Sequence, residues 1–216
     1  TFFVMGDEEA IKEVAKSHAA PPVLRKEVER LRRATDADRH VNVLFYPNFL
    51  ANNDGEPLFA GDRMRGRAPL LWLLGDDLQA GSLSVRGAAE FYWEVRLLSS
   101  LSKEKSILAS EFRDRLQQVP VSIRKYIAAM NPPEYWKEFA FMFPGMITQL
   151  HAQTRVGVEE ESAVVNCVLP AVAAHNLVLG TELSLATAPG AAGTAVAAKP
   201  MGPKGNIKSI EDVLGV

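Results

Sequence analysis

The sequence predicts an α+β fold in which antiparallel β-hairpins form sheet structure that packs against helices. Two observations support this prediction. Residues 78–86 and 91–98 flank a short connection that contains Gly87, and the second segment alternates apolar and polar side chains, which is typical of a hairpin with one buried face. Other segments, such as 102–119, repeat apolar residues at helical spacing. The apolar faces of the hairpins and of the helices must both be shielded from water, and packing the helices on the sheet buries both.

The first part of the chain indicates a strand, two helices and a second strand. Residues 2–5 form a short apolar run, and Asp7 then caps a helix whose apolar face includes Ile11. Two adjacent prolines begin a second helix over residues 21–33. Residues 40–45 are rich in valine and leucine, so we expect a strand that enters the core.

Residues 46–68 have the composition of a long loop, with two prolines and an Asn-Asn-Asp-Gly turn signal. Loops of this length in a compact domain commonly carry function. Guanidinium groups on such a loop suit carboxylate or phosphate ligands. The candidate contacts for a partner or an anionic ligand are therefore Arg63, Arg65 and Arg67. The alternative is that nearby acids pair with these arginines and the loop is only solvated.

The second half of the chain indicates three helices followed by another hairpin and a final helix. We expect the 102–119 helix to be followed by a separate one over 123–130. The Asn-Pro-Pro-Glu sequence then begins a helix that should end at Pro144 and Gly145. Residues 154–169 contain two strand-like runs around an acidic turn, and Pro170 opens the last helix. Because each hairpin precedes helical sequence, the chain is compatible with two diverged halves.

The composition divides the chain into three parts. Residues 1–185 have the apolar patterning of one globular domain. Residues 186–208 are dominated by alanine, glycine, proline and threonine, which predicts a linker. Residues 209–216 resemble the capped first turn of another helix, so we expect a further module and a longer parent protein.

Charge and cysteine content exclude several classes of protein. The formal net charge of -2 gives no overall attraction to nucleic acid, so we expect protein partners or other domains of the parent chain. One cysteine excludes an internal disulfide and a thiolate-rich metal site, but it leaves a cytoplasmic or an exported location open. Residues 162–181 lack Asp, Glu, Lys and Arg, yet Asn166, Pro170 and His175 in their interior argue against a transmembrane segment.

The sequence contains no catalytic, cofactor-binding or metal-binding constellation that we recognise. Cys167 and His175 are the one pair with the chemistry of nucleophile and base, but Cys167 lies in an apolar strand, which is typical of an inert buried thiol. We expect His175 to satisfy buried backbone groups instead. No two histidines have the spacing of a zinc pair on a helix. The polar residues at 36–40 are typical of a junction between a helix and a strand.

Three segments, at residues 3–11, 36–40 and 168–176, resemble uncharacterised domains of large bacterial multidomain proteins of the planctomycete type. The resemblance extends over most of residues 1–185. It implies a bacterial, multidomain setting and supplies no activity, cofactor or catalytic residue. The sequence therefore favours a non-catalytic interaction or scaffolding domain of a larger bacterial protein. The alternative is a hydrolase or transferase whose site is not recognisable in the sequence.

Overall fold

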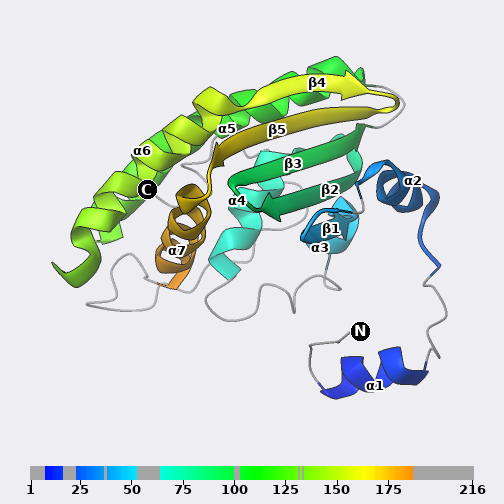
Figure 1. The fold of residues 1–216 in the computed structure, drawn as a ribbon, viewed down its shortest axis with the longest axis horizontal. Helices are drawn as coiled ribbons and strands as arrows, with labels where there is room; N and C mark the ends of the chain where they lie inside the picture. Colours follow the sequence, from blue (N-terminus) through cyan, green and yellow to red (C-terminus); the bar gives the residue numbers. More distant parts are fainter. Residues whose placement is uncertain are drawn as a thin grey trace.

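The computed structural model of this chain describes residues 8–16, 23–36, 38–52, 64–99, 103–130, 132 and 134–186. Within them, a five-stranded antiparallel sheet packs against helices, which confirms the predicted α+β class (Figure 1). The strands are β1 (Val41–Phe45), β2 (Leu78–Gly87), β3 (Glu90–Ser99), β4 (Arg155–Glu159) and β5 (Ser162–Pro170). The helices are α1 (Glu8–Lys16), α2 (Lys26–Ala34), α3 (Pro47–Ala51), α4 (Met64–Leu74), α5 (Lys105–Met130), the 3₁₀ helix η3 (Glu134–Trp136), α6 (Lys137–Gln153) and α7 (Val172–Ala186).

The strand order in the sheet is β1-β2-β3-β5-β4, and every neighbouring pair is antiparallel. Both predicted hairpins are present, as β2–β3 and β4–β5. Pairing of β3 with β5 joins the two hairpins into one sheet, and β4 and β1 form its edges. An origin by internal duplication stays a prediction.

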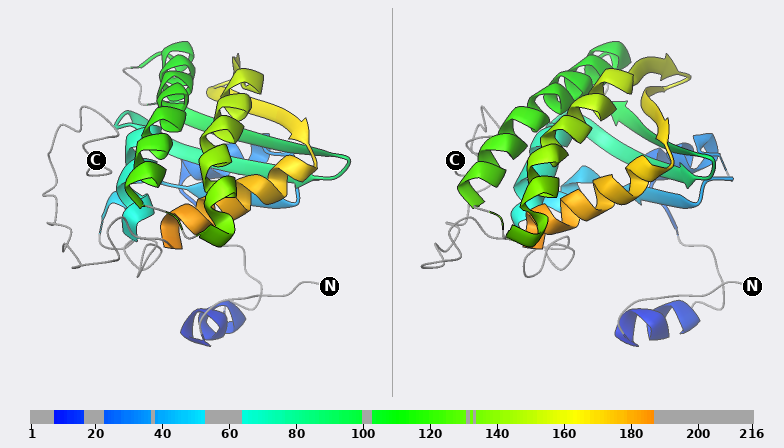
Figure 2. Two further views of the ribbon diagram at one scale, coloured as in Figure 1. Left: turned by 90° about the vertical axis from the view of Figure 1, so that its left-hand side faces the viewer. Right: turned by 60° about the vertical axis from the view of Figure 1, so that its left-hand side comes forward.

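One face of the sheet is apolar and packs against helices. Residues of β3 alternate between the two faces, so Trp93, Val95 and Leu97 share this face. Helices α5, α6 and α7 lie on this side, and α2 lies on the other (Figure 2). The main core consists of Leu50, Leu74, Leu78, Trp93, Val95, Leu97, Leu108, Ala109, Phe112, Leu116, Ala163, Val165, Cys167 and Leu169.

The opposite face is covered at one end by α2, which packs against β1 and β2. Leu31 of α2 is fully buried there against Ala80 and Leu98. The residues beneath α2 are otherwise largely polar, and they are described with the candidate site. Our sequence-based expectation that the β2–β3 hairpin has only one buried face is therefore wrong, because α2 covers the second face.

A second apolar cluster holds the far ends of α5 and α6 together and comprises Tyr126, Ile127, Trp136, Ala140, Phe143 and Ile147. Helix α7 packs closely on α6 at Gly180. A Cβ atom at that position would overlap the ring of Phe143, so only glycine allows this approach.

Three expectations about element boundaries are wrong, and each error involves proline. Residues 105–130 form one helix, with Pro120 inside it, where we expected two. Helix α6 continues through Pro144 and Gly145 without a break. A proline inside a helix costs about 3 kcal/mol, and apolar contacts on both sides of each proline offset this cost. The region predicted as loop contains α3 and the start of α4, which itself includes Pro69.

The N-terminal helix is present as α1, but Ile11 on its expected apolar face is exposed. The strand expected at residues 2–5 lies outside the described residues, as do residues 187–208 of the expected linker and the module expected at 209–216.

Candidate functional site

The sheet face that carries α2 has a polar row that crosses all five strands. In the strand register, Asn42 is opposite Ser84, Ser84 is opposite Glu94, Glu94 is opposite Asn166, and Asn166 is opposite Arg155. Side chains at directly opposed positions lie on the same face of a sheet. The five strands therefore contribute a continuous row of polar side chains to this face of the sheet.

An ion pair occupies the centre of this row. The carboxylate of Glu94 accepts hydrogen bonds from Arg96 Nε at 2.7 Å and from the Tyr92 hydroxyl at 2.5 Å. Arg96 also donates to Glu159 on β4 at 2.8 Å. The side chains of Glu94 and Arg96 are 6% and 11% exposed, so this pair is largely removed from water. Burial, with the neighbouring Glu94 carboxylate, raises the pKa of the Tyr92 hydroxyl above its ordinary value.

Residues 36–40 connect α2 to the same polar network. The Arg39 guanidinium lies 4.3 Å from the centre of the Tyr92 ring and donates to Asp36 at 2.6 Å. Asp38 pairs with Arg86 of β2 at 2.9 Å. These contacts agree with the interpretation of 36–40 as a junction, because they tie the end of α2 to the sheet.

Two serines beneath α2 have no such partners. The hydroxyl oxygens of Ser82 and Ser84 are buried and make no hydrogen bond in the described part of the chain. An unsatisfied buried hydroxyl costs about 1–3 kcal/mol. These two hydroxyls therefore add no hydrogen bond between the sheet and α2 in the described part of the chain.

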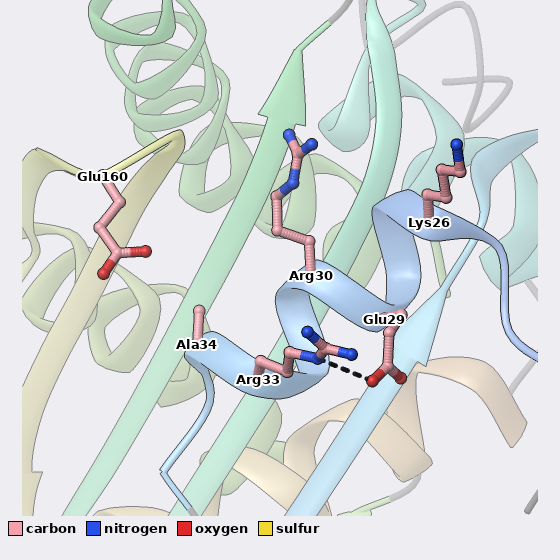
Figure 3. Close-up of a pocket in the computed structure, with 6 residues that line it drawn as sticks. All are labelled: Lys26, Glu29, Arg30, Arg33, Ala34 and Glu160. Atoms are coloured by element: carbon pink, nitrogen blue, oxygen red, sulfur yellow. Dashed lines mark hydrogen bonds and ion pairs between the residues drawn. The ribbon is translucent and has the colours of Figure 1, made fainter.

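A groove lies between α2 and the turn that joins β4 to β5, with a volume of about 500 Å³. Figure 3 shows Glu160 of the turn on one side and α2 on the other. Its lining residues are charged with one exception, and they are Lys26, Glu29, Arg30, Arg33, Ala34 and Glu160. Arg30 spans the two walls through an ion pair with Glu161.

The α2 wall of the groove is basic. Lys26, Arg30 and Arg33 are spaced at i, i+4 and i+7, so they lie along one face of the helix. Glu29 pairs with Arg32 at 2.8 Å and with Arg33 at 2.9 Å, and these bonds lower its pKa to about 2. Glu29 therefore forms its ion pairs within α2. The basic stripe of Lys26, Arg30 and Arg33 outnumbers this one acid, so the α2 wall has a positive net charge.

The turn wall has a conformational peculiarity. Glu160 has a φ of 50°, in the left-handed region that favours glycine. A residue with a Cβ there costs about 1–2 kcal/mol. Glu160 is the first residue of the two-residue turn between β4 and β5, and such turns require a positive φ at this position.

The structure places one of the three arginines predicted from the sequence. Arg67 lies on α4 and donates to the backbone carbonyls of Leu50, Ala51 and Asn52, at 3.0, 2.7 and 2.9 Å. These carbonyls belong to the C-terminal end of α3, where helical acceptors are otherwise unpaired. Arg63 and the side chain of Arg65 lie outside the described residues. A partner or anion contact at these arginines stays a prediction.

The residues weighed for catalysis do not converge in the described structure. Cys167 is buried, its Sγ lies 3.6 Å from the Leu150 carbonyl, and burial raises the pKa of its thiol. His175 is exposed on α7, so our expectation that it satisfies buried backbone groups is wrong. Burial lowers the pKa of His151. The described residues contain no cluster of three or more potential metal ligands.

Sequence reasoning missed the groove. The basic stripe of α2 is readable as helical spacing, but the acidic turn lies more than a hundred residues further along the chain, and only the sheet order brings the two together. None of the described helices is long and apolar enough to span a membrane. Comparisons with models of protein families, with curated proteins and with solved structures found no significant match to this chain.

Proposed function

We propose that this chain is a non-catalytic interaction module of a larger bacterial protein, and that its groove binds an extended acidic segment of a partner protein. The observation that carries the proposal is the groove itself, whose α2 wall presents Lys26, Arg30 and Arg33 in one line. Carboxylates are the natural partners of such a stripe.

The chain's own contacts support an acidic partner. Arg30 binds the carboxylate of Glu161 across the groove. Both side chains are more than half exposed, and exposed ion pairs are worth only about 0–1 kcal/mol. A carboxylate of a partner therefore replaces Glu161 at little cost.

The spacing of the stripe favours an extended partner. Lys26 and Arg30 are four helical residues apart, which is about 6 Å along the axis. Alternate side chains of an extended peptide are about 6.6–6.8 Å apart on one side. A segment with an acid at every second position thus presents carboxylates at nearly the spacing of the stripe.

The groove offers less support for an enzyme. Among the described residues that line it, there is no cysteine, histidine, serine or tyrosine. The residues that we weighed as nucleophile and base, Cys167 and His175, line no part of it. General acid–base or nucleophilic chemistry needs such groups within hydrogen-bond reach of a bound substrate.

A peptide-binding experiment tests the proposal. A fluorescently labelled peptide of alternating glutamate and serine is titrated with the full chain by fluorescence anisotropy, beside a lysine and serine peptide of equal length. We expect binding of the acidic peptide only, with weaker binding at high salt. The double variant Arg30→Ser with Arg33→Ser should weaken binding about tenfold, because two exposed ion pairs are lost.

The matched control is Arg32→Ser on the same helix, since Arg32 is similarly exposed but does not line the groove. This variant should leave binding within about twofold of the parent chain. Equal binding of the two peptides, or equal loss in the control and the double variant, would contradict the proposed site.

A further inference from the structure

Among the strands that the structure describes, β4 lies at one edge of the sheet and pairs with β5 alone. All five of its residues are exposed. An exposed strand edge presents unpaired backbone groups and is a template for pairing with another chain, unless it is blocked by proline, a bulge or repelling charges. The strand has no proline, its register with β5 is regular, and its charges are of both signs.

The turn after β4 determines which backbone groups point outward. Two residues, Glu160 and Glu161, connect the strands, and the pair that flanks a two-residue turn exchanges hydrogen bonds. Glu159, Gly157 and Arg155 therefore direct their N–H and C=O groups toward β5. Val156 and Val158 direct theirs toward the open edge.

The sequence of β4 is complementary to itself in the antiparallel direction. It reads Arg-Val-Gly-Val-Glu, with Gly157 at the centre. A second copy that pairs about Gly157 places Arg155 opposite Glu159 and Val156 opposite Val158 of that copy. Arg155 makes no ion pair with any described residue, whereas Glu159 already binds Arg96 and has a further acceptor oxygen.

We propose that two copies of this chain associate through antiparallel pairing of their β4 strands about Gly157, so that the two sheets become one. In this register Val156 and Val158 exchange both backbone hydrogen bonds across the interface, because these are the residues with outward groups. The same valines are 37% and 47% exposed in one copy, and they contact each other in the pair. Charge, apolar contact and hydrogen-bond pattern thus all favour one register.

The arrangement has a consequence for the rest of the molecule. Antiparallel pairing relates the two copies by a two-fold axis perpendicular to the sheet, which keeps equivalent faces on the same side. The polar faces become continuous, and Arg155 and Glu159 lie on them. The proposal does not depend on the proposed function, since it concerns the sheet edge rather than the groove.

Charge variants of the full chain test the association by sedimentation velocity. At about 100 µM the parent chain should be dimeric, because a dimer with a micromolar Kd is then almost fully formed. Arg155→Glu places two like-charge pairs in the interface and should weaken dimerisation at least about tenfold, as should Glu159→Arg. An equimolar mixture of the two variants should form a dimer again, since both of its pairs are then complementary.

Restored association in the mixture also shows that each variant folds. A monomeric parent chain, a dimeric Arg155→Glu variant or a mixture that stays monomeric would overturn the proposal. Peptide binding to α2 is measured separately, so failure of one proposal leaves the other standing.

Disulfide formation tests the register. Gly157 is opposite itself across the axis at a non-hydrogen-bonded position, where Cα atoms are about 4.5 Å apart and a disulfide fits. A Cβ at Gly157 meets no atom within 4 Å in one copy, so Gly157→Cys introduces no clash. This variant should cross-link rapidly on mild oxidation, and Val158→Cys, which is opposite Val156, should do so at least about tenfold more slowly. Equal rates in the two variants would refute the register.

Discussion

The two faces of the sheet differ in what holds their helices in place. On one face, β3 contributes Trp93, Val95 and Leu97 to a large apolar core beneath α5, α6 and α7. On the other, the next residues of the same strand are Tyr92, Glu94 and Arg96, and α2 is anchored in apolar contact chiefly by Leu31. The comparison indicates that the first face determines the stability of the fold. The second face holds α2 through fewer apolar contacts and carries the polar side chains of β3.

The largest difference in stability between the two faces is expected from two adjacent leucines of β3. Leu97 and Leu98 are 0% and 4% exposed, and they point to opposite faces. Leu97→Ala should lower the free energy of unfolding by about 4 kcal/mol, because the large core relaxes only partly around a cavity. Leu98→Ala should cost about 2 kcal/mol, because α2 can shift to fill the space. Chemical denaturation of both variants measures the difference.

Hydrogen exchange provides a second measurement on the Leu97→Ala and Leu98→Ala variants. In hydrogen exchange, Leu98→Ala should increase exchange selectively in α2, and Leu97→Ala should increase it throughout the sheet. Equal free-energy losses with the same exchange pattern would mean that the two faces contribute alike.

A smaller effect is expected from the ion pair on the polar face. Glu94→Gln removes the charge from a carboxylate that binds Arg96 and Tyr92, and Arg96 keeps Glu159 as its second partner. We expect a loss of about 2 kcal/mol, below the full cost of breaking a buried pair, because one partner remains. The matched control is Glu90→Gln at the exposed start of the same strand, which should change stability by less than about 0.5 kcal/mol. Similar losses in the two variants would show that burial of Glu94 is not energetically important.

Local patterns in the sequence were sufficient to predict the hairpins, because alternation and turn residues act over a few positions. The turn between β2 and β3 and the turn between β4 and β5 lie close to the positions predicted from the sequence. The helices were predicted less well. Pro120 and Pro144 are strong local signals for a helix end, but apolar contacts distant in sequence outweigh them.

The candidate site was harder to predict, for a similar reason. Glu94 and Arg96 alternate with apolar residues as solvent-exposed positions do, yet both side chains are largely buried in the fold. Arg67 has the chemistry of an anion ligand, and its Nε and Nη2 donate to carbonyls of α3 and of the residue that follows it. The function of a charged side chain depends on which partners the fold brings within reach, and a single sequence does not contain that information.

The smallest expected effect has the opposite sign and concerns the turn wall of the groove. Glu160→Gly removes the strain of a left-handed residue but adds freedom to the unfolded chain, so the free energy of unfolding should rise by about 0.5 kcal/mol. Glu161→Gly is the control, because Glu161 is not left-handed and pairs with Arg30. It should lower stability by about 0.5–1 kcal/mol. Thermal unfolding of both variants measures the contrast, and a loss in both would show that the conformation of Glu160 is not strained.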